Sequence, residues 1–520
     1  MRAVLSVFMF VFSLSGLNVA GDIQYSSDVV EALEQAGENG SELEKVFIHY
    51  GSPDDFLKLQ AALFLVGNME GHGYVTYMMH DSTGAEIDFN VLDYPDFDAL
   101  LAACDILEEK KGEIDFKKNE MVYDIKTIKA EFLINQIDYA FKAWKEKPWA
   151  DAFSFDSFCK YILPYRGSNE PLENWRESFL EKYVGLEKKM KDPSDPMEAA
   201  SLINDDIKSW FGFDPRYYYH PTDQGLSEML ESGLGRCEDM TNLAIYALRA
   251  NGLAITSDYT PFWANSGNNH AWNAIATADG QVIPFMGAES NPGVYRLANK
   301  LAKVYRKMYG KQKDNLIFQE RKQEKVPRWL GGKSYLDVTA SYTDVCDVSI
   351  EFEKEIPDSV DTGYLCVFNS GEWKAIQWGK IENGKAVFKD MGSDQIAYLP
   401  ALYLNEEIVP YGSPFILDKN CELRSLCKNG ETDDFSLIST TRRKQEISTD
   451  SIIKTYFASG KEYELFYWDF GWQSFGKSTA GDAPLKFESV PSGCLYWLVE
   501  EDSDEEERIF TIDDGFQEWW

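Results

Sequence analysis

The sequence predicts an α+β multidomain protein with a helical N-terminal region, an α+β core and two tandem C-terminal β-sandwich-like modules. Three observations predict this order. Apolar residues recur at helical spacing over residues 22–150, a helix pattern followed by strand patterns surrounds Cys237 and His270, and aromatic residues beyond residue 336 recur at a fixed offset. The expected units are a signal peptide at 1–21, a helical N-terminal domain at 22–150, the core at 151–335, β module 1 at 336–435 and β module 2 at 436–520.

The first residues have the pattern of a signal peptide. Arg2 precedes a mostly apolar run over residues 3–12, and small residues follow at Ala20 and Gly21. We therefore expect a secreted or periplasmic protein. No later run reaches about 18 uninterrupted apolar residues, so no membrane insertion is expected.

The composition excludes several classes of partner and cofactor. The chain has 520 residues, of which 44% are hydrophobic, and its formal net charge of −35 disfavours nucleic acid and anionic membrane surfaces as partners. The eight cysteines are scattered without a Cys-x-x-Cys pair, so no metal site is expected, and no sequence feature requires an organic cofactor. Cys421 and Cys427 are close enough in sequence to close a small disulfide loop.

The N-terminal domain is predicted to consist of helices separated by glycine-containing breaks at 37–40 and 71–73. A long helix is predicted over residues 127–147, because Ile128, Phe132 and Phe141 share one face at helical spacing.

Cys237 lies in the most informative segment of the core. It follows Gly235-Arg236 and precedes apolar residues at helical spacing, and the pattern stops at Asn251-Gly252. Cys237 is therefore predicted to stand in the first turn of a buried helix. The helix dipole and free backbone N–H groups at that position favour thiolate over thiol.

His270 lies 33 residues after Cys237 (270 − 237), in His-Ala-Trp-Asn-Ala-Ile, which is typical of a strand. The chain has only five histidines. A cysteine on a helix start and a histidine on a later strand have the side-chain chemistry of a nucleophile and its general base.

These two segments resemble the transglutaminase-like superfamily, whose fold is related to that of papain. The family pattern is Gly-x-Cys-x-Asp, then a helix that ends in glycine, then a strand that begins His-Ala-Trp. The matching residues are Gly235, Cys237, Asp239, Gly252, His270, Ala271 and Trp272. The resemblance spans roughly residues 200–310. It implies that Cys237 attacks an amide carbonyl, that His270 moves the proton, and that the protein is a bacterial peptidase or amidase.

One position departs from the family pattern. The catalytic acid of the family follows the next strand, where this chain has Met286. A thioether cannot orient an imidazole or stabilise its protonated form. The nearest carboxylate is Glu289, which we assign as the candidate third catalytic residue, and the amides of Asn268, Asn269 or Asn273 are the alternative.

The C-terminal modules are predicted from a repeat. Trp373 and Trp472 are 99 residues apart (472 − 373), as are Phe388 and Phe487 (487 − 388), and Phe368 is matched with Tyr467 at the same offset (467 − 368). Such a period with apolar alternation indicates two related β modules, expected to fold separably. The matched aromatic residues either form the module cores or present a tryptophan platform for carbohydrate.

The sequence is best interpreted as that of a thiol-dependent hydrolase or transferase acting on amide bonds of peptides, proteins or glycopeptides. Cys237 is the nucleophile, His270 the base and acid, and Trp263, Trp272 and Asn269 are the expected substrate contacts. Two alternatives remain open. One is a non-catalytic scaffold whose β modules bind glycan or protein, and the other is an amidase acting on glycosylated asparagine.

Overall fold

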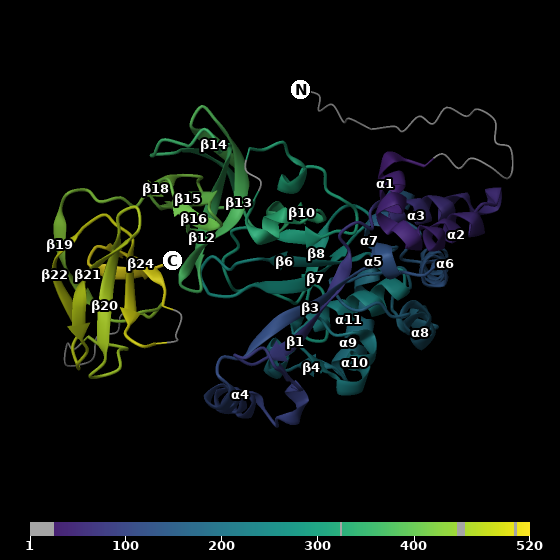
Figure 1. Ribbon diagram of the computed structural model, residues 1–520, viewed down its shortest axis with the longest axis horizontal. Helices are drawn as coiled ribbons and strands as arrows, with labels where there is room; N and C mark the ends of the chain where they lie inside the picture. Colours follow the sequence, from purple (N-terminus) through teal and green to yellow (C-terminus); the bar gives the residue numbers. More distant parts are fainter. Residues whose placement is uncertain (1–24, 323–324, 445–452, 504–506) are drawn as a thin grey trace.

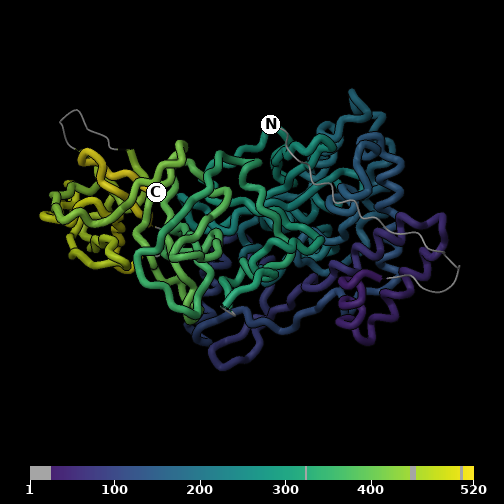
Figure 2. The backbone as a smooth tube through the Cα atoms, turned by 90° about the horizontal axis from the view of Figure 1, so that it is seen from above, coloured from purple at the N-terminus to yellow at the C-terminus, as the bar shows by residue number. Residues whose placement is uncertain are grey.

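The computed structural model describes residues 25–322, 325–444, 453–503 and 507–520. The N-terminal helices, the core and the two β modules follow one another along the long axis of the molecule (Figures 1 and 2). The signal peptide expected at 1–21 lies outside the described residues. Within the described ranges, every helix is too short or too polar to cross a bilayer.

The N-terminal region is helical, with a three-stranded antiparallel sheet that the sequence pattern did not predict. Its main helices are α1 Ser27–Ala36, α2 Gly40–His49, α3 Phe56–Gly67, α4 Phe97–Lys111 and α6 Ala130–Glu146, the last of which confirms the long helix expected at 127–147. The sheet has the order β2-β1-β3, from β1 Gly73–His80, β2 Glu86–Ile87 and β3 Asp115–Tyr123. Most residues of these strands are partly or fully exposed, so they carry no clear alternation of apolar residues.

The core packs helices against an antiparallel sheet. Helix α11 Cys237–Ala250 is buried along its length from Asp239 onward. Beside it, the five-stranded sheet has the order β10-β9-β6-β7-β8. The strands are β6 Ile255–Thr260, β7 His270–Ala276, β8 Val282–Phe285, β9 Tyr305–Lys307 and β10 Tyr335–Asp337. The other core helices are α7 Phe155–Tyr161, α8 Arg176–Lys182, α9 Pro196–Lys208 and α10 Leu226–Ser232.

The two C-terminal modules have a similar strand order. Module 1 is one eight-stranded sheet with the order β11-β14-β13-β12-β15-β17-β18, in which β16 pairs with β15; module 2 has a two-stranded sheet, β19-β22, and a five-stranded sheet with the order β21-β20-β23-β24-β25. The strands of module 1 are β11 Val345–Glu351, β12 Thr362–Asn369, β13 Glu372–Glu382, β14 Lys385–Gly392, β15 Ile396–Leu404, β16 Glu407–Pro410, β17 Phe415–Leu417 and β18 Leu423–Ser425. Those of module 2 are β19 Thr432–Leu437, β20 Glu462–Trp468, β21 Trp472–Thr479, β22 Leu485–Pro491, β23 Tyr496–Glu500, β24 Ile509–Asp513 and β25 Phe516–Trp519.

Strand pairing corrects one detail of the predicted repeat. Trp373 pairs with Phe368, and Trp472 pairs with Trp468, so the structural equivalent of Phe368 is Trp468 and not Tyr467. The first strand of the hairpin is therefore offset by 100 residues (468 − 368) and the second by 99 (472 − 373), because four residues separate Phe368 from Trp373 and three separate Trp468 from Trp472. The equivalence of Trp373 and Trp472 stands.

The modules pack tightly on the core and on each other. Alternate residues of β12 belong to two different apolar clusters. Leu365 is in a cluster formed mainly by module 1, whereas Tyr364 is in a cluster that also contains Tyr305 of the core and Trp468 of module 2. The boundary expected at 335/336 falls inside β10, and the one expected at 435/436 falls inside β19.

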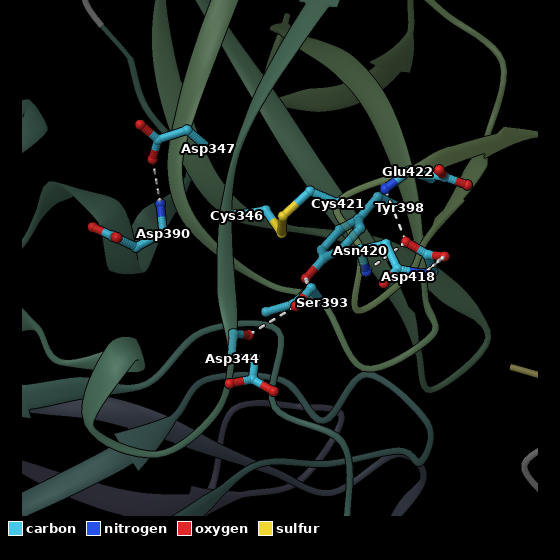
Figure 3. The surroundings of a disulfide bond; sticks show 11 residues. Asp344, Cys346, Asp347, Asp390, Ser393, Tyr398, Asp418, Asn420, Cys421 and Glu422 are labelled. Atoms are coloured by element: carbon cyan, nitrogen blue, oxygen red, sulfur yellow. Dashed lines mark hydrogen bonds between the residues drawn. A yellow bond between two sulfur atoms is a disulfide. The ribbon is translucent and has the colours of Figure 1, made fainter.

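A disulfide joins Cys346 at the start of β11 to Cys421 in the turn between β17 and β18 (Figure 3). The pairing of Cys421 with Cys427 expected from the sequence is wrong, and Cys427 is an exposed free cysteine. The turn itself is organised by Asp418, whose carboxylate accepts the backbone N–H groups of Asn420 (2.9 Å) and Glu422 (2.8 Å) (Figure 3). Proximity in sequence favoured the short loop, but the disulfide joins β11, at one end of the strand order of module 1, to the β17–β18 turn at the other end.

Candidate active site

Cys237 is the first residue of α11, as the motif predicts. Asp239 caps this helix start: its carboxylate accepts the backbone N–H groups of Arg236 and Gln224, both at 2.9 Å. Gly235 is required because a Cβ at this position would lie 2.7 Å from the Asp239 Cβ. In the Gly-x-Cys-x-Asp pattern, the glycine therefore allows close packing against Asp239 and the aspartate caps the helix start. The cysteine side chain stays partly exposed.

The electrostatics of the thiol differ from the expectation based on the helix dipole. Burial, followed by the negative charge of Glu238, raises the pKa of Cys237 to about 11. Backbone N–H groups of Ala271 and Glu238 and the charge of Arg236 act in the opposite direction and lower that pKa. The resting side chain is a neutral thiol, and the donors that would stabilise a thiolate are already in place.

Glu238 links the thiol to Lys307 on β9. One oxygen, Oε2, lies 4.0 Å from the Cys237 Sγ, and the other, Oε1, accepts from the Lys307 Nζ at 2.6 Å. Lys307 also donates to the Ser168 Oγ at 2.6 Å. Neither Glu238 nor Lys307 was predicted as a site residue, although Glu238 stands directly after the cysteine.

His270 opens β7, and its Nε2 lies 2.7 Å from the hydroxyl oxygen of Tyr295. Burial lowers the pKa of His270, while the carboxylate of Glu238 opposes that shift. Tyr295 was missed by sequence reasoning, because it lies 25 residues beyond His270 in a segment without helix or strand. Burial, then the charges of Glu289 and Cys237, raise the pKa of Tyr295; Glu289 itself is exposed in the turn after β8.

The position of the family acid is filled by an apolar side chain. Met286 follows β8 and is 1% exposed. Its neighbour Gly287 donates its N–H to the Asn273 Oδ1 at 3.1 Å, and Asn273 also donates to the carbonyl of Thr241 at 3.1 Å. Asn273 therefore ties β7 to the turn after β8 and to α11.

Of the remaining predicted residues, Trp263 and Trp272 lie beside His270, whereas Asn269 lies on the surface. The ring of Trp263 stacks on His270 with centroids 5.8 Å apart, and Trp272 lies tilted at the same distance. Trp272 is fully buried and donates its indole N–H to the hydroxyl of Tyr342 at 3.2 Å. It therefore packs against His270 from inside the core and does not face solvent. Asn269 is exposed in the loop before β7.

Module 1 holds the loop that carries Trp263. The side-chain amide of Asn369, at the end of β12, donates to three backbone carbonyls of this loop: Trp263 (3.1 Å), Ser266 (2.9 Å) and Asn268 (2.9 Å). Asn268 itself has a positive φ of 64°. The geometry of the active-site loop therefore depends on a residue outside the core.

The described residues contain no group of three or more His, Cys, Asp or Glu side chains placed to hold a metal ion. The chemistry available at the site is that of a thiol, an imidazole, a phenol hydroxyl and two carboxylates.

Comparison with known proteins assigns a family to one part of the chain. Residues 185–285 match the model of the Transglutaminase-like superfamily, so this part of the chain is a transglutaminase-like core. The solved structure of red sea bream transglutaminase aligns with 86% of this chain and 77% of its own, at 9% sequence identity and a TM-score of 0.21. No curated protein matches the chain. Members of this superfamily are generally Cys–His enzymes that act on amides.

Proposed function

We propose that this chain, with its transglutaminase-like core, is an exported thiol-dependent hydrolase or acyl transferase that acts on amide bonds of peptides, proteins or glycopeptides. The observation that carries the proposal is the arrangement of Cys237, His270 and Tyr295. The Nε2 of His270 is engaged by Tyr295, which leaves Nδ1 as the ring nitrogen available to the thiol.

In the proposed reaction, the thiol proton of Cys237 moves to the Nδ1 of His270 as the sulfur bonds to the amide carbonyl carbon. The backbone N–H of Cys237 at the helix start stabilises the oxyanion. Collapse of the intermediate breaks the carbon–nitrogen bond, and the imidazolium gives its proton to the leaving amine. Water then releases the acyl group from sulfur in hydrolysis, or a second amine takes it in transfer.

Tyr295 takes the place of the missing acid in this proposal. A His270 Nε2–H that donates to the Tyr295 oxygen leaves the Nδ1 lone pair free to accept the thiol proton. Glu289, whose charge raises the pKa of Tyr295, would then act on the imidazole through the phenol rather than directly. In this proposal Glu289 has an outer role, in place of the direct catalytic role that the sequence predicted.

A neutral resting pair is compatible with such a mechanism. The raised pKa of Cys237 and the lowered pKa of His270 both favour the uncharged forms. Substrate binding would replace the surrounding water and present the carbonyl carbon to the sulfur, so that proton transfer and attack occur together.

Export is proposed from the first 21 residues and is supported by the Cys346–Cys421 disulfide, because disulfides persist mainly in oxidising compartments. Fusion of residues 1–30 to a reporter that is active only after export tests this directly. Retention of the reporter in the cytoplasm contradicts it.

The function is tested with the full chain on a mixed library of peptides, glycopeptides and primary amines, with products identified by mass spectrometry. We expect cleavage or amine incorporation that disappears in Cys237→Ala and His270→Ala. Glu231→Gln, an exposed change on α10, is the matched control and should keep full activity. Activity that survives Cys237→Ala would place the chemistry elsewhere.

The alternative of a non-catalytic scaffold is favoured by one observation, the buried Met286 at the acid position. It predicts that no substrate in the library turns over and that Tyr295→Phe has no effect on any measured property other than stability.

A further inference from the structure

A second concave site lies where the two β modules meet the core, apart from the catalytic cysteine. It is a cleft of about 650 Å³ lined by aromatic, charged and small side chains. The lining aromatic residues are Phe262, Trp329, Trp373, Tyr403, Trp468 and Trp472.

The internal repeat builds this cleft. Trp373 and Trp472 are equivalent residues of the two modules, and both hairpin turns, at Gly371 and Gly471, border the same hollow. The rings of Trp373 and Trp472 both meet Phe368 edge-on, with centroids 5.5 and 5.9 Å away. The duplication therefore places two copies of one tryptophan at a shared surface.

The cleft also contains hydrogen-bonding groups without internal partners. The indole N–H groups of Trp373 and Trp468 are buried and have no acceptor among the described residues, whereas Trp329 donates to the Ala375 carbonyl at 2.9 Å. Arg328, Lys374, Glu372 and Glu407 add charged donors and acceptors to the rim.

We propose that this cleft binds a neutral oligosaccharide. Sugar rings offer flat C–H faces that stack on indole rings, and each hydroxyl both donates and accepts, so it can bind the carboxylates and the cationic side chains of the rim together. A proline-rich peptide also fits aromatic grooves, but it has no backbone N–H to offer the carboxylates. A polyanion is disfavoured by the net charge of −35.

The position of the cleft connects it with the catalytic site. Phe262 lines the cleft and directly precedes Trp263, whose ring stacks on His270. Trp263 is also held by Asn369 through its carbonyl. The oligosaccharide site therefore makes glycan-bearing amides the favoured substrate class, an extension that rests on the proposed function, whereas sugar binding itself does not.

The test uses the full chain carrying Cys237→Ala, so that binding is measured without turnover. Intrinsic tryptophan fluorescence and calorimetry are followed with free chitotetraose, cellotetraose, xylotetraose and mannotetraose, and with decaproline as the peptide probe. We expect at least one tetrasaccharide to bind with a Kd below about 1 mM. Trp472→Ala should weaken it at least about tenfold, which corresponds to about 1.4 kcal/mol.

Two further variants keep the test decisive. Glu407→Gln changes an exposed rim residue and leaves the core intact, so its expected loss of about threefold or more does not depend on a change in folding. Trp210→Ala, in the core and outside the cleft, is the matched tryptophan control and should bind normally. Absence of sugar binding at about 10 mM, binding of decaproline alone, or equal affinity in wild type, Trp472→Ala and Glu407→Gln would each overturn the proposal.

Discussion

Neutralising Glu238 should make the Cys237 thiol more acidic. Glu238→Gln removes the charge whose oxygen lies 4.0 Å from the Sγ, and it keeps an oxygen that can accept from Lys307. Two unit charges 4 Å apart interact by about 1 kcal/mol in water and by about 4 kcal/mol at an effective dielectric constant of 20. At 1.36 kcal/mol per pKa unit, this range is about 0.7–3 units.

Lys307 places the expected shift near the lower end of that range. Its ammonium lies 2.6 Å from the Glu238 Oε1 and already offsets much of the carboxylate charge. We therefore expect the pKa of Cys237 to fall by about 1 unit from its value of about 11. Below the pKa, one unit gives about ten times more thiolate, but intrinsic nucleophilicity falls by about threefold, so alkylation at a fixed pH should rise about threefold to fourfold.

The assay is the rate of iodoacetamide labelling of the Cys237 peptide, followed by mass spectrometry from pH 7 to 11. Peptide-level detection matters because Cys427 is exposed and will label independently. Glu231→Gln is the control for a general change in charge. An unchanged or higher midpoint in Glu238→Gln would refute the assignment of Glu238 as a group that holds the thiol neutral.

Four further results are expected. Tyr295→Phe should lower kcat by about 10–100-fold with little change in KM, because an unoriented imidazole accepts the thiol proton poorly, and an unchanged kcat would remove Tyr295 from the mechanism. Cys346→Ser should lower the free energy of unfolding in urea by about 2–4 kcal/mol under oxidising conditions, and reducing agent should abolish the difference from wild type. Asn369→Ala should lower activity more than it lowers the melting temperature, because it frees three carbonyls of the active-site loop; a proportional loss of both would indicate a purely structural role. Removal of residues 336–520 should yield insoluble protein, since it exposes the apolar cluster shared by core and modules, and a soluble, labelled fragment would show the units to be separable.

The parts of the fold that could be predicted are those with strong local patterns. The buried face of α11 and the start of β7 carry apolar spacing and a motif that agree with each other, so Cys237 and His270 were placed correctly on their elements. The repeated modules were visible through Phe388 and Phe487, which are buried at equivalent places in the β11–β14 and β19–β22 pairs. Aromatic residues mark these positions because core packing admits few substitutes.

The remaining features depend on contacts that sequence spacing does not encode. Tyr295 reaches His270 from an irregular segment, and Cys346 reaches Cys421 across a sheet, so neither has a periodic signal. The thiol pKa was expected to be lowered by the helix start, but the depth of burial and the charge of Glu238 outweigh the dipole. The strands β1 and β3 were missed because they are largely exposed and lack alternation.

The three hydrogen bonds from Asn369 have a consequence for the order in which the protein matures. The loop before His270 is complete only when a side chain 101–106 residues later in the chain has been synthesised and module 1 has folded around it. A nascent chain that ends within the core would contain Cys237 and His270 but not Asn369, which holds the loop before His270. Catalytic competence would thus arrive late, only after module 1 has been synthesised and has folded.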